Sequence, residues 1–118
     1  MIQLVNSLIG KPYDAKQFNC FTLVCLFHPS LNIPEEVIHS GVKRSIAETR
    51  RLLALFTRQY EYVTSPSDND IVLSNDTHVG IFVGGRVLHT SPPTNTILES
   101  LDTYLMTHSR TKYLRIIK

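Results

Sequence analysis

The sequence predicts an α+β domain in which N-terminal helices pack on a small antiparallel β-sheet. Apolar residues at helical spacing dominate the first half of the chain, and short β-branched segments dominate the second half. A Gly-Gly dipeptide between two of those segments is typical of a tight hairpin. The chain has 118 residues and 42% hydrophobic content, which suits one core, so we expect a single domain over residues 1–118.

Charge and composition narrow the function classes. The formal net charge is +2 and the basic residues are scattered, which disfavours a nucleic-acid-binding surface. No apolar stretch approaches the roughly 20 residues of a membrane-spanning helix. The segment after Met1 lacks a charged region followed by a long apolar stretch, so we expect synthesis in the cytoplasm without a secretory signal.

The chain has two cysteines, Cys20 and Cys25, which are the only pair available for a disulfide. If this segment is helical, their spacing corresponds to about 500° of rotation, which places the side chains on different faces. A disulfide needs Cα atoms within about 7 Å and converging side chains. We therefore expect two free thiols in a reducing compartment.

The first two elements are expected to be helices. Apolar spacing predicts a helix over residues 2–9, which Gly10 ends. The stretch "FNCFTLVCLF" (18–27) contains a good N-cap residue, Asn19, and Pro29 follows it. A buried strand would have a similar apolar run, but the cap and the proline favour a helix.

Two more helices are expected before the sheet. Residues 32–41 predict a short helix with Pro34 in its first turn. Residues 45–60 predict the clearest helix of the chain, because Ser45 and Glu48 have capping-box spacing. The apolar stripe of that helix consists of Leu52, Leu53, Phe56 and Tyr60.

A polar loop that begins at Thr64 marks the change to the sheet-forming half. Asp70, at the start of the first strand, is interpreted as a turn residue rather than a catalytic acid. The expected elements are a strand over 70–74, a hairpin of 77–83 and 86–91 that turns at Gly84 and Gly85, a segment over 97–100, a short helix over 101–108 and a last strand over 112–117.

A two-residue turn places two histidines on one face of the hairpin. If Gly84 and Gly85 form the turn, Gly80 lies opposite His89, and His78 lies one diagonal step from His89. Their Cβ atoms are then roughly 7–8 Å apart or slightly closer, within reach of two imidazoles. Gly80 is expected to leave open space beside His89. A three-residue turn would instead place the histidines on opposite faces.

Cys20 is the candidate nucleophile, because the N-terminus of a helix stabilises a thiolate and lowers the thiol pKa. One histidine of the hairpin could then serve as general base, and the second could fix its tautomer. The alternative is that Cys20 is a core residue and the histidines are structural.

A metal site of Cys20, His78 and His89 lacks a close-spaced ligand pair, so we expect neither a metal nor a cofactor. The other histidines, His28, His39 and His108, are interpreted as loop or helix-end residues.

The order and spacing of these motifs resemble those of the NlpC/P60 cysteine peptidases, which are papain-like cell-wall hydrolases. "LIGKPYDAKQFNCFTLV" is similar to the family segment in which Gly, a variable residue and Pro-Tyr precede the catalytic cysteine on a helix. "NDIVLSNDTHVGIFVGGRVLHTS" is similar to the second block, in which the base histidine opens a His-Val-Gly-Ile strand. "LESLDTYLMTHSRTKYLRI" is similar to the tail of phage-associated members. Asn69 stands where glycine is common in the family.

The resemblance implies the papain-like NlpC/P60 fold and a role for each site residue. Cys20 would be the nucleophile, His78 the general base and His89 the third member of a Cys-His-His triad. Tyr13 would line the substrate cleft, and the backbone N–H of Cys20 would stabilise the oxyanion. The implied activity is that of a cysteine endopeptidase or amidase that cleaves peptidoglycan stem peptides through a thioester.

A cell-wall activity without a secretory signal or a wall-binding repeat suits a phage virion component or an effector that a secretion machine delivers to the periplasm. The implied partners are the peptidoglycan peptide and phage tail or secretion-system proteins. Two alternatives stay open. The fold could act mainly as an interaction module in tail assembly or in an effector, or it could act on another acyl or amide substrate, such as a lipid or a protein glutamine.

Overall fold

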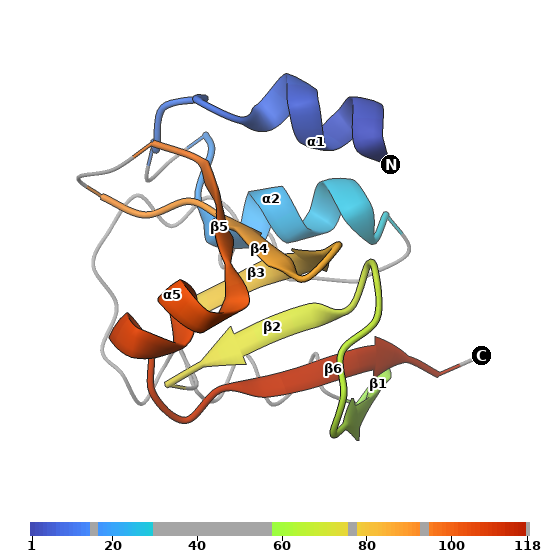
Figure 1. Cartoon of the computed structure of the whole chain (residues 1–118). Coiled ribbons are helices and arrows are strands. Elements are labelled where there is room, and N and C mark those ends of the chain that lie inside the picture. Colours follow the sequence, from blue (N-terminus) through green and yellow to red (C-terminus); the bar gives the residue numbers. More distant parts are fainter. Residues whose placement is uncertain (15–16, 30–57, 76–77, 93–94, 118) are drawn as a thin grey trace.

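The chain folds around one six-stranded antiparallel sheet, in a computed structural model that describes residues 1–14, 17–29, 58–75, 78–92 and 95–117. The spatial order of the strands is β1-β6-β2-β3-β4-β5 (Figure 1). The strands are β1 (Tyr60–Val63), β2 (Ile71–Ser74), β3 (His78–Val83), β4 (Arg86–His89), β5 (Ile97–Ser100) and β6 (Lys112–Ile116). The helices of the described residues are α1 (Ile2–Leu8), α2 (Cys20–Phe27) and α5 (Leu101–Thr107). The α+β class with antiparallel pairing is therefore confirmed.

The cap predicted at Asn19 is present. Its side-chain oxygen accepts the backbone N–H of Thr22 at 3.0 Å and the hydroxyl of Thr22 at 3.1 Å. The helix ends at His28, whose N–H donates to the carbonyl of Val24. The stretch that contains both cysteines is therefore a helix rather than a strand, and both thiols are free.

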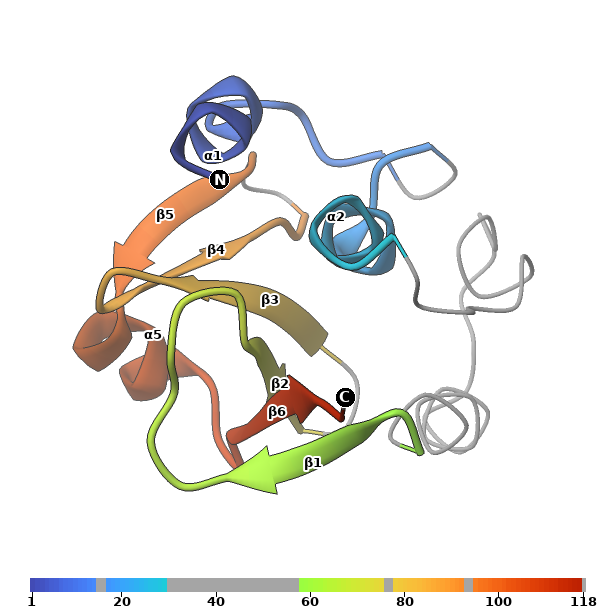
Figure 2. The same cartoon turned by 90° about the vertical axis from the view of Figure 1, so that its right-hand side faces the viewer.

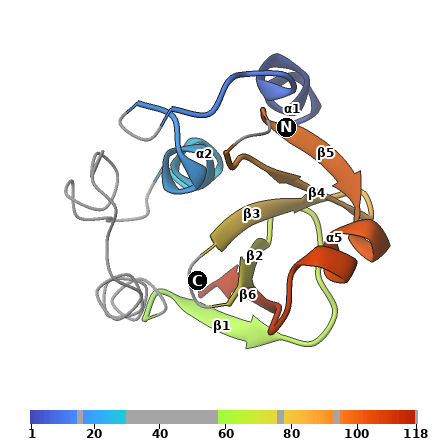
Figure 3. The same cartoon turned by 90° about the vertical axis from the view of Figure 1, so that its left-hand side faces the viewer.

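The sheet has a hydrophobic cluster on each face. Leu8 of α1 and Leu23 of α2 pack with Ile81 on one face, and Tyr104 of α5 packs with Phe82 on the other. Neighbouring residues of β3 belong to different clusters because side chains alternate along a strand. Figures 2 and 3 show α2 and α5 on opposite sides of β3. Helices therefore cover β3 on both of its faces.

The hairpin turns at Gly84 and Gly85, as expected. Val83 pairs with Arg86, so the turn has two residues. Both glycines have positive φ, 55° and 80°, which a type I′ turn requires. The register that places His78 and His89 on one face follows from this turn.

The helix predicted over 45–60 does not extend to Tyr60. Residues 58–59 form a turn, and Tyr60 begins β1, which pairs with β6 near the C-terminal end of the chain. Tyr60 is buried, and its hydroxyl donates to Nδ1 of His28 at 3.3 Å. This pairing partner is distant in sequence, so local spacing did not reveal it. The helix predicted over 32–41 and residues 45–57 lie outside the described residues.

Asp70 is a structural residue, as interpreted from the sequence. Its carboxylate accepts the N–H of Ser67 at 2.7 Å and two N–H groups of Arg115 at 3.0 and 2.8 Å. Asn69 has φ of 77°, a left-handed conformation that asparagine tolerates better than most residues. Asparagine is therefore suited to this turn position.

Within the described residues, each helix is too short or too polar to cross a bilayer.

Candidate active site

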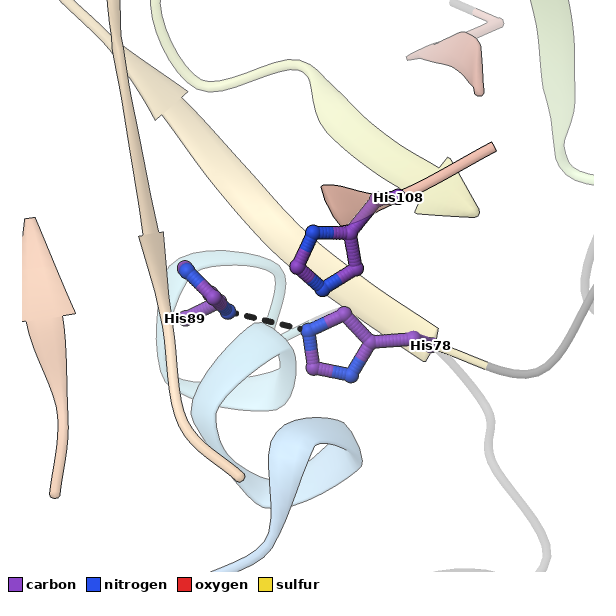
Figure 4. A group of neighbouring side chains, drawn as sticks. All are labelled: His78, His89 and His108. Carbon is purple, nitrogen blue, oxygen red and sulfur yellow. Dashed lines mark hydrogen bonds between the residues drawn. The ribbon is translucent and has the colours of Figure 1, made fainter. Parts of the chain in front are cut away.

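The two strand histidines lie in contact. Nε2 of His78 and Nδ1 of His89 are 3.0 Å apart, a hydrogen-bond distance (Figure 4). The two rings meet edge to face, with centroids 5.2 Å apart. The predicted same-face geometry of His78 and His89 is therefore confirmed.

Glu99 extends this pair, and sequence reasoning missed it. Its Oε1 lies 2.7 Å from Nε2 of His89. Glu99 pairs with Val87 in the β4–β5 ladder, so Glu99 and His89 share a face. Knowledge of the register of β5 against β4 would have shown that Glu99 lies beside His89, but no sequence motif indicates that register.

The hydrogen bonds fix the tautomers of both imidazoles. A carboxylate only accepts, so Nε2 of His89 carries a proton and donates to Glu99. Nδ1 of the neutral His89 ring is then an acceptor, and Nε2 of His78 donates to it. The remaining nitrogen of His78, Nδ1, is left with a lone pair and can accept a proton.

Burial keeps both imidazoles neutral. It lowers the pKa of His78 to about 3, with smaller contributions from the neighbouring His89 and His108. Burial also lowers the pKa of His89, and the hydrogen bond to Glu99 opposes that shift. A neutral His78 with a free lone pair at Nδ1 is in the form that a general base requires.

Cys20 lies beside the start of β3. The backbone N–H groups of Val79, Cys20 and Phe21 lie close enough to its thiol to lower the thiol pKa. Val79 follows His78 directly in the chain, so the thiol lies near the backbone at the start of β3. Cys20 is half-buried, in contact with the core cluster on the α2 face.

The contact with Val79 is possible because the ladder between β3 and β4 stops early. The N–H of Phe82 donates to Asp70 on the β2 side, and alternate N–H groups of a strand point to opposite edges. The N–H of Val79 therefore points toward β4. The last β3–β4 pair is Ile81 with Leu88, so this N–H lies beyond the ladder and is available to Cys20.

The thiol pKa of Cys20 is raised, which corrects the expectation from the helix N-terminus. Burial is the largest influence and raises this pKa above the ordinary value of 9.0. The three backbone N–H groups lower the pKa by a smaller amount. Cys20 is therefore a neutral thiol and His78 a neutral imidazole.

The raised pKa predicts how the rate of Cys20 alkylation depends on pH. Only the thiolate reacts, so the rate with iodoacetamide should keep rising with pH beyond 9. Mass spectrometry of the peptide that contains Cys20, after brief labelling at a series of pH values, measures this rate. A plateau reached below pH 7 would contradict the prediction, because it would indicate a resting thiolate.

Cys25 has a different environment. It is half-buried and packs against the core cluster on the α2 face. Burial raises its pKa, and among the described residues no backbone N–H group contributes to the shift. Cys25 is therefore a packing residue and a suitable control for Cys20.

The space beside His89 differs from the expectation. A Cβ atom at Gly80 would lie 2.8 Å from the carbonyl oxygen of Leu88 and 3.0 Å from Cβ of His89. Gly80 therefore leaves no open space. It allows β3 and β4 to approach closely, which holds His89 within reach of His78.

Two tyrosines lie within electrostatic range of the thiol. Tyr13 is half-buried, and its pKa is raised by burial, by Cys20 and by Asp14. Tyr104, which the sequence did not single out, is fully buried and donates or accepts a hydrogen bond with Ser74 at 2.7 Å. Burial raises the pKa of Tyr104 to about 12, and Cys20 contributes to that shift. Both phenols are therefore neutral neighbours of Cys20.

His108 joins the histidine pair. It is the C-cap of α5, as its interpretation as a helix-end residue requires. Its ring also stacks on Tyr104, with centroids 3.9 Å apart, and on His78, with centroids 5.1 Å apart. No periodicity relates His108 to the hairpin, because α5 and β3 come together only in the fold.

The chain matches no family model and no curated protein.

Proposed function

We propose that this chain is a cysteine endopeptidase or amidase with the papain-like NlpC/P60 fold, and that it cleaves peptidoglycan stem peptides. One observation carries the proposal. The Cys20 thiol lies near the backbone N–H of Val79, one residue from a His78 whose tautomer is set by His89 and Glu99. A nucleophile, a base and a chain that orients the base are the groups that acyl transfer needs.

The reaction follows from the proton positions. As Sγ of Cys20 attacks the amide carbon, the thiol proton moves to Nδ1 of His78. Backbone N–H groups at the start of α2 stabilise the oxyanion. His78 then protonates the leaving amine, and a thioester remains on Cys20. Water gives its proton to His78, attacks the thioester and releases the acid and the free thiol.

The substrate class rests on the motif resemblance around Cys20 and His78, and Tyr13 is the residue proposed to line the cleft. Phage tail or secretion-system proteins are the proposed partners. In this proposal the protein acts on the wall as part of a virion or after delivery to the periplasm.

The test is mass spectrometry of soluble products after the purified protein is incubated with peptidoglycan. We expect stem-peptide fragments with a new amino group and a new carboxyl group, and no fragments after Cys20 has been alkylated with iodoacetamide. Intact peptidoglycan after prolonged incubation, with Cys20 unreactive even at alkaline pH, would contradict the proposal. That outcome would favour an interaction module or a different acyl substrate.

Glu99 is proposed as a positioning residue. In a Glu99→Gln variant we expect kcat to fall about 10- to 100-fold, because an amide does not hold His89 in a single tautomer. The 15N chemical shifts of the imidazoles report the tautomer directly, and they should change for His89 and His78. Glu61→Gln, at an exposed position of β1, is the matched control and should change neither kcat nor the shifts. Unchanged histidine shifts in Glu99→Gln would contradict this role.

A further inference from the structure

One ring nitrogen from each of His78, His89 and His108 lies within 4.8 Å of the others. The three imidazoles come from β3, from β4 and from the end of α5, and Figure 4 shows them turned toward one another. No other group of three or more potential metal ligands of this kind occurs among the described residues. Cys20 is not a member of the group, so this set differs from the one that includes the candidate nucleophile.

We propose that His78, His89 and His108 form a binding site for a divalent transition-metal ion such as zinc. Imidazole nitrogen is a preferred ligand of zinc, and three histidines leave the fourth tetrahedral position for water. Zinc binding by these three histidines does not depend on the proposed hydrolysis, because Cys20 is not one of the ligands.

The outer contacts of the histidines support the proposal. Histidine ligands usually donate their second ring N–H to a carboxylate or a backbone carbonyl, which fixes the lone pair that faces the metal. His89 has such a partner in Glu99, at 2.7 Å from Nε2. His108 has one in the carbonyl of Tyr104, at 3.0 Å from Nδ1. Nδ1 of His89 and Nε2 of His108 therefore hold lone pairs that are available to a metal.

To bind a metal ion through Nε2, His78 needs only a change of tautomer. In the metal-free pair its Nε2 proton is donated to His89. Metal binding at Nε2 of His78 moves that proton to Nδ1 of the same ring, so the charge of the imidazole does not change. Nδ1 of His78 is then protonated and cannot accept the proton of Cys20. The metal-bound form is consequently inactive in the proposed hydrolysis.

The distances are compatible with one ion. Zinc–nitrogen bonds of about 2.0–2.1 Å in a tetrahedral site place two ligand nitrogens about 3.3 Å apart. The 3.0 Å separation of His78 and His89 already approaches this value. The widest separation, within 4.8 Å, must shorten by up to about 1.5 Å. His108 follows the last turn of α5 and is only half-buried, so rotation of its side chain can supply this movement.

Equilibrium dialysis of the whole chain against zinc chloride, followed by metal analysis, tests the proposal without reference to activity. We expect one zinc ion per chain in the wild type and in Cys20→Ala. We expect His108→Gln to bind at least about 100-fold more weakly, and Glu99→Gln about 10- to 100-fold more weakly. His28→Gln, a histidine outside the group, should bind as the wild type does.

X-ray absorption of the zinc-loaded wild type should show nitrogen ligands at about 2.0–2.1 Å and no sulfur ligand at about 2.3 Å. Circular dichroism checks that each variant is folded before its affinity is measured. Wild-type affinity in His108→Gln, loss of binding in Cys20→Ala, or a sulfur ligand in the absorption spectrum would each overturn the three-histidine site. None of these outcomes bears on the proposed hydrolysis, which the peptidoglycan assay tests separately.

Discussion

Replacement of Cys20 by alanine is expected to lower kcat for stem-peptide hydrolysis by on the order of 10⁶-fold, as removal of a covalent nucleophile does. The variant keeps His78, His89 and Glu99 but has no atom that can form the thioester. Cys20 is half-buried, so its loss should change the free energy of unfolding by about 1 kcal/mol or less. Product formation per unit time, from wild type and variant at equal concentration, measures the effect.

Cys25→Ala is the matched control for this experiment. It makes the same change on the same helix, at a thiol whose pKa is lowered by no backbone N–H group of the described residues. We expect its kcat to stay within about threefold of the wild type, since it removes only packing. If Cys20→Ala were as active as the wild type, Cys20 would not be the nucleophile, whatever the activity of Cys25→Ala.

Replacement of Leu23 by alanine is expected to lower the free energy of unfolding by about 2–5 kcal/mol. Leu23 is completely buried, with 0% exposure, and it anchors α2 against the sheet. The change removes buried methyl groups and leaves a cavity that the surrounding strands fill only in part. Small domains have a total stability of about 5–15 kcal/mol, so this is a large share. Urea denaturation followed by far-UV circular dichroism measures the loss.

Leu26→Ala provides the control for Leu23→Ala. Leu26 lies on the same helix and is 46% exposed, so the helix propensity changes equally in both variants while the buried area does not. We expect its free energy of unfolding to change by about 0.5 kcal/mol or less. If both variants lost the same stability, the result would contradict the conclusion that Leu23 anchors α2 against the sheet.

Local signals in the sequence predicted the elements that carry the candidate site. The Asn19 cap and the two-glycine turn each depend on a few adjacent residues, and both are present in the fold. The parity of the turn was enough to bring His78 and His89 to the same face. These features could be predicted because hydrogen bonding within a turn or cap does not depend on the rest of the chain.

Features that depend on distant pairing were missed. β1 forms by pairing Tyr60 and its neighbours with β6, and Glu99 reaches His89 only through the β4–β5 register. His108 approaches His78 because α5 packs on the opposite face of the sheet from α2. A single sequence contains no local pattern for such contacts, because each joins segments whose separation along the chain is not fixed by any spacing rule.

The sequence by itself determined that Cys20 stands at the start of a capped helix and that two histidines share one face of a hairpin. Only the tertiary structure decided the protonation states. Burial raises the thiol pKa of Cys20 more than the helix N-terminus lowers it, and burial also keeps His78 neutral. The reason is that a helix dipole acts over one turn of local backbone, whereas removal of a charge from water depends on every element that packs around it.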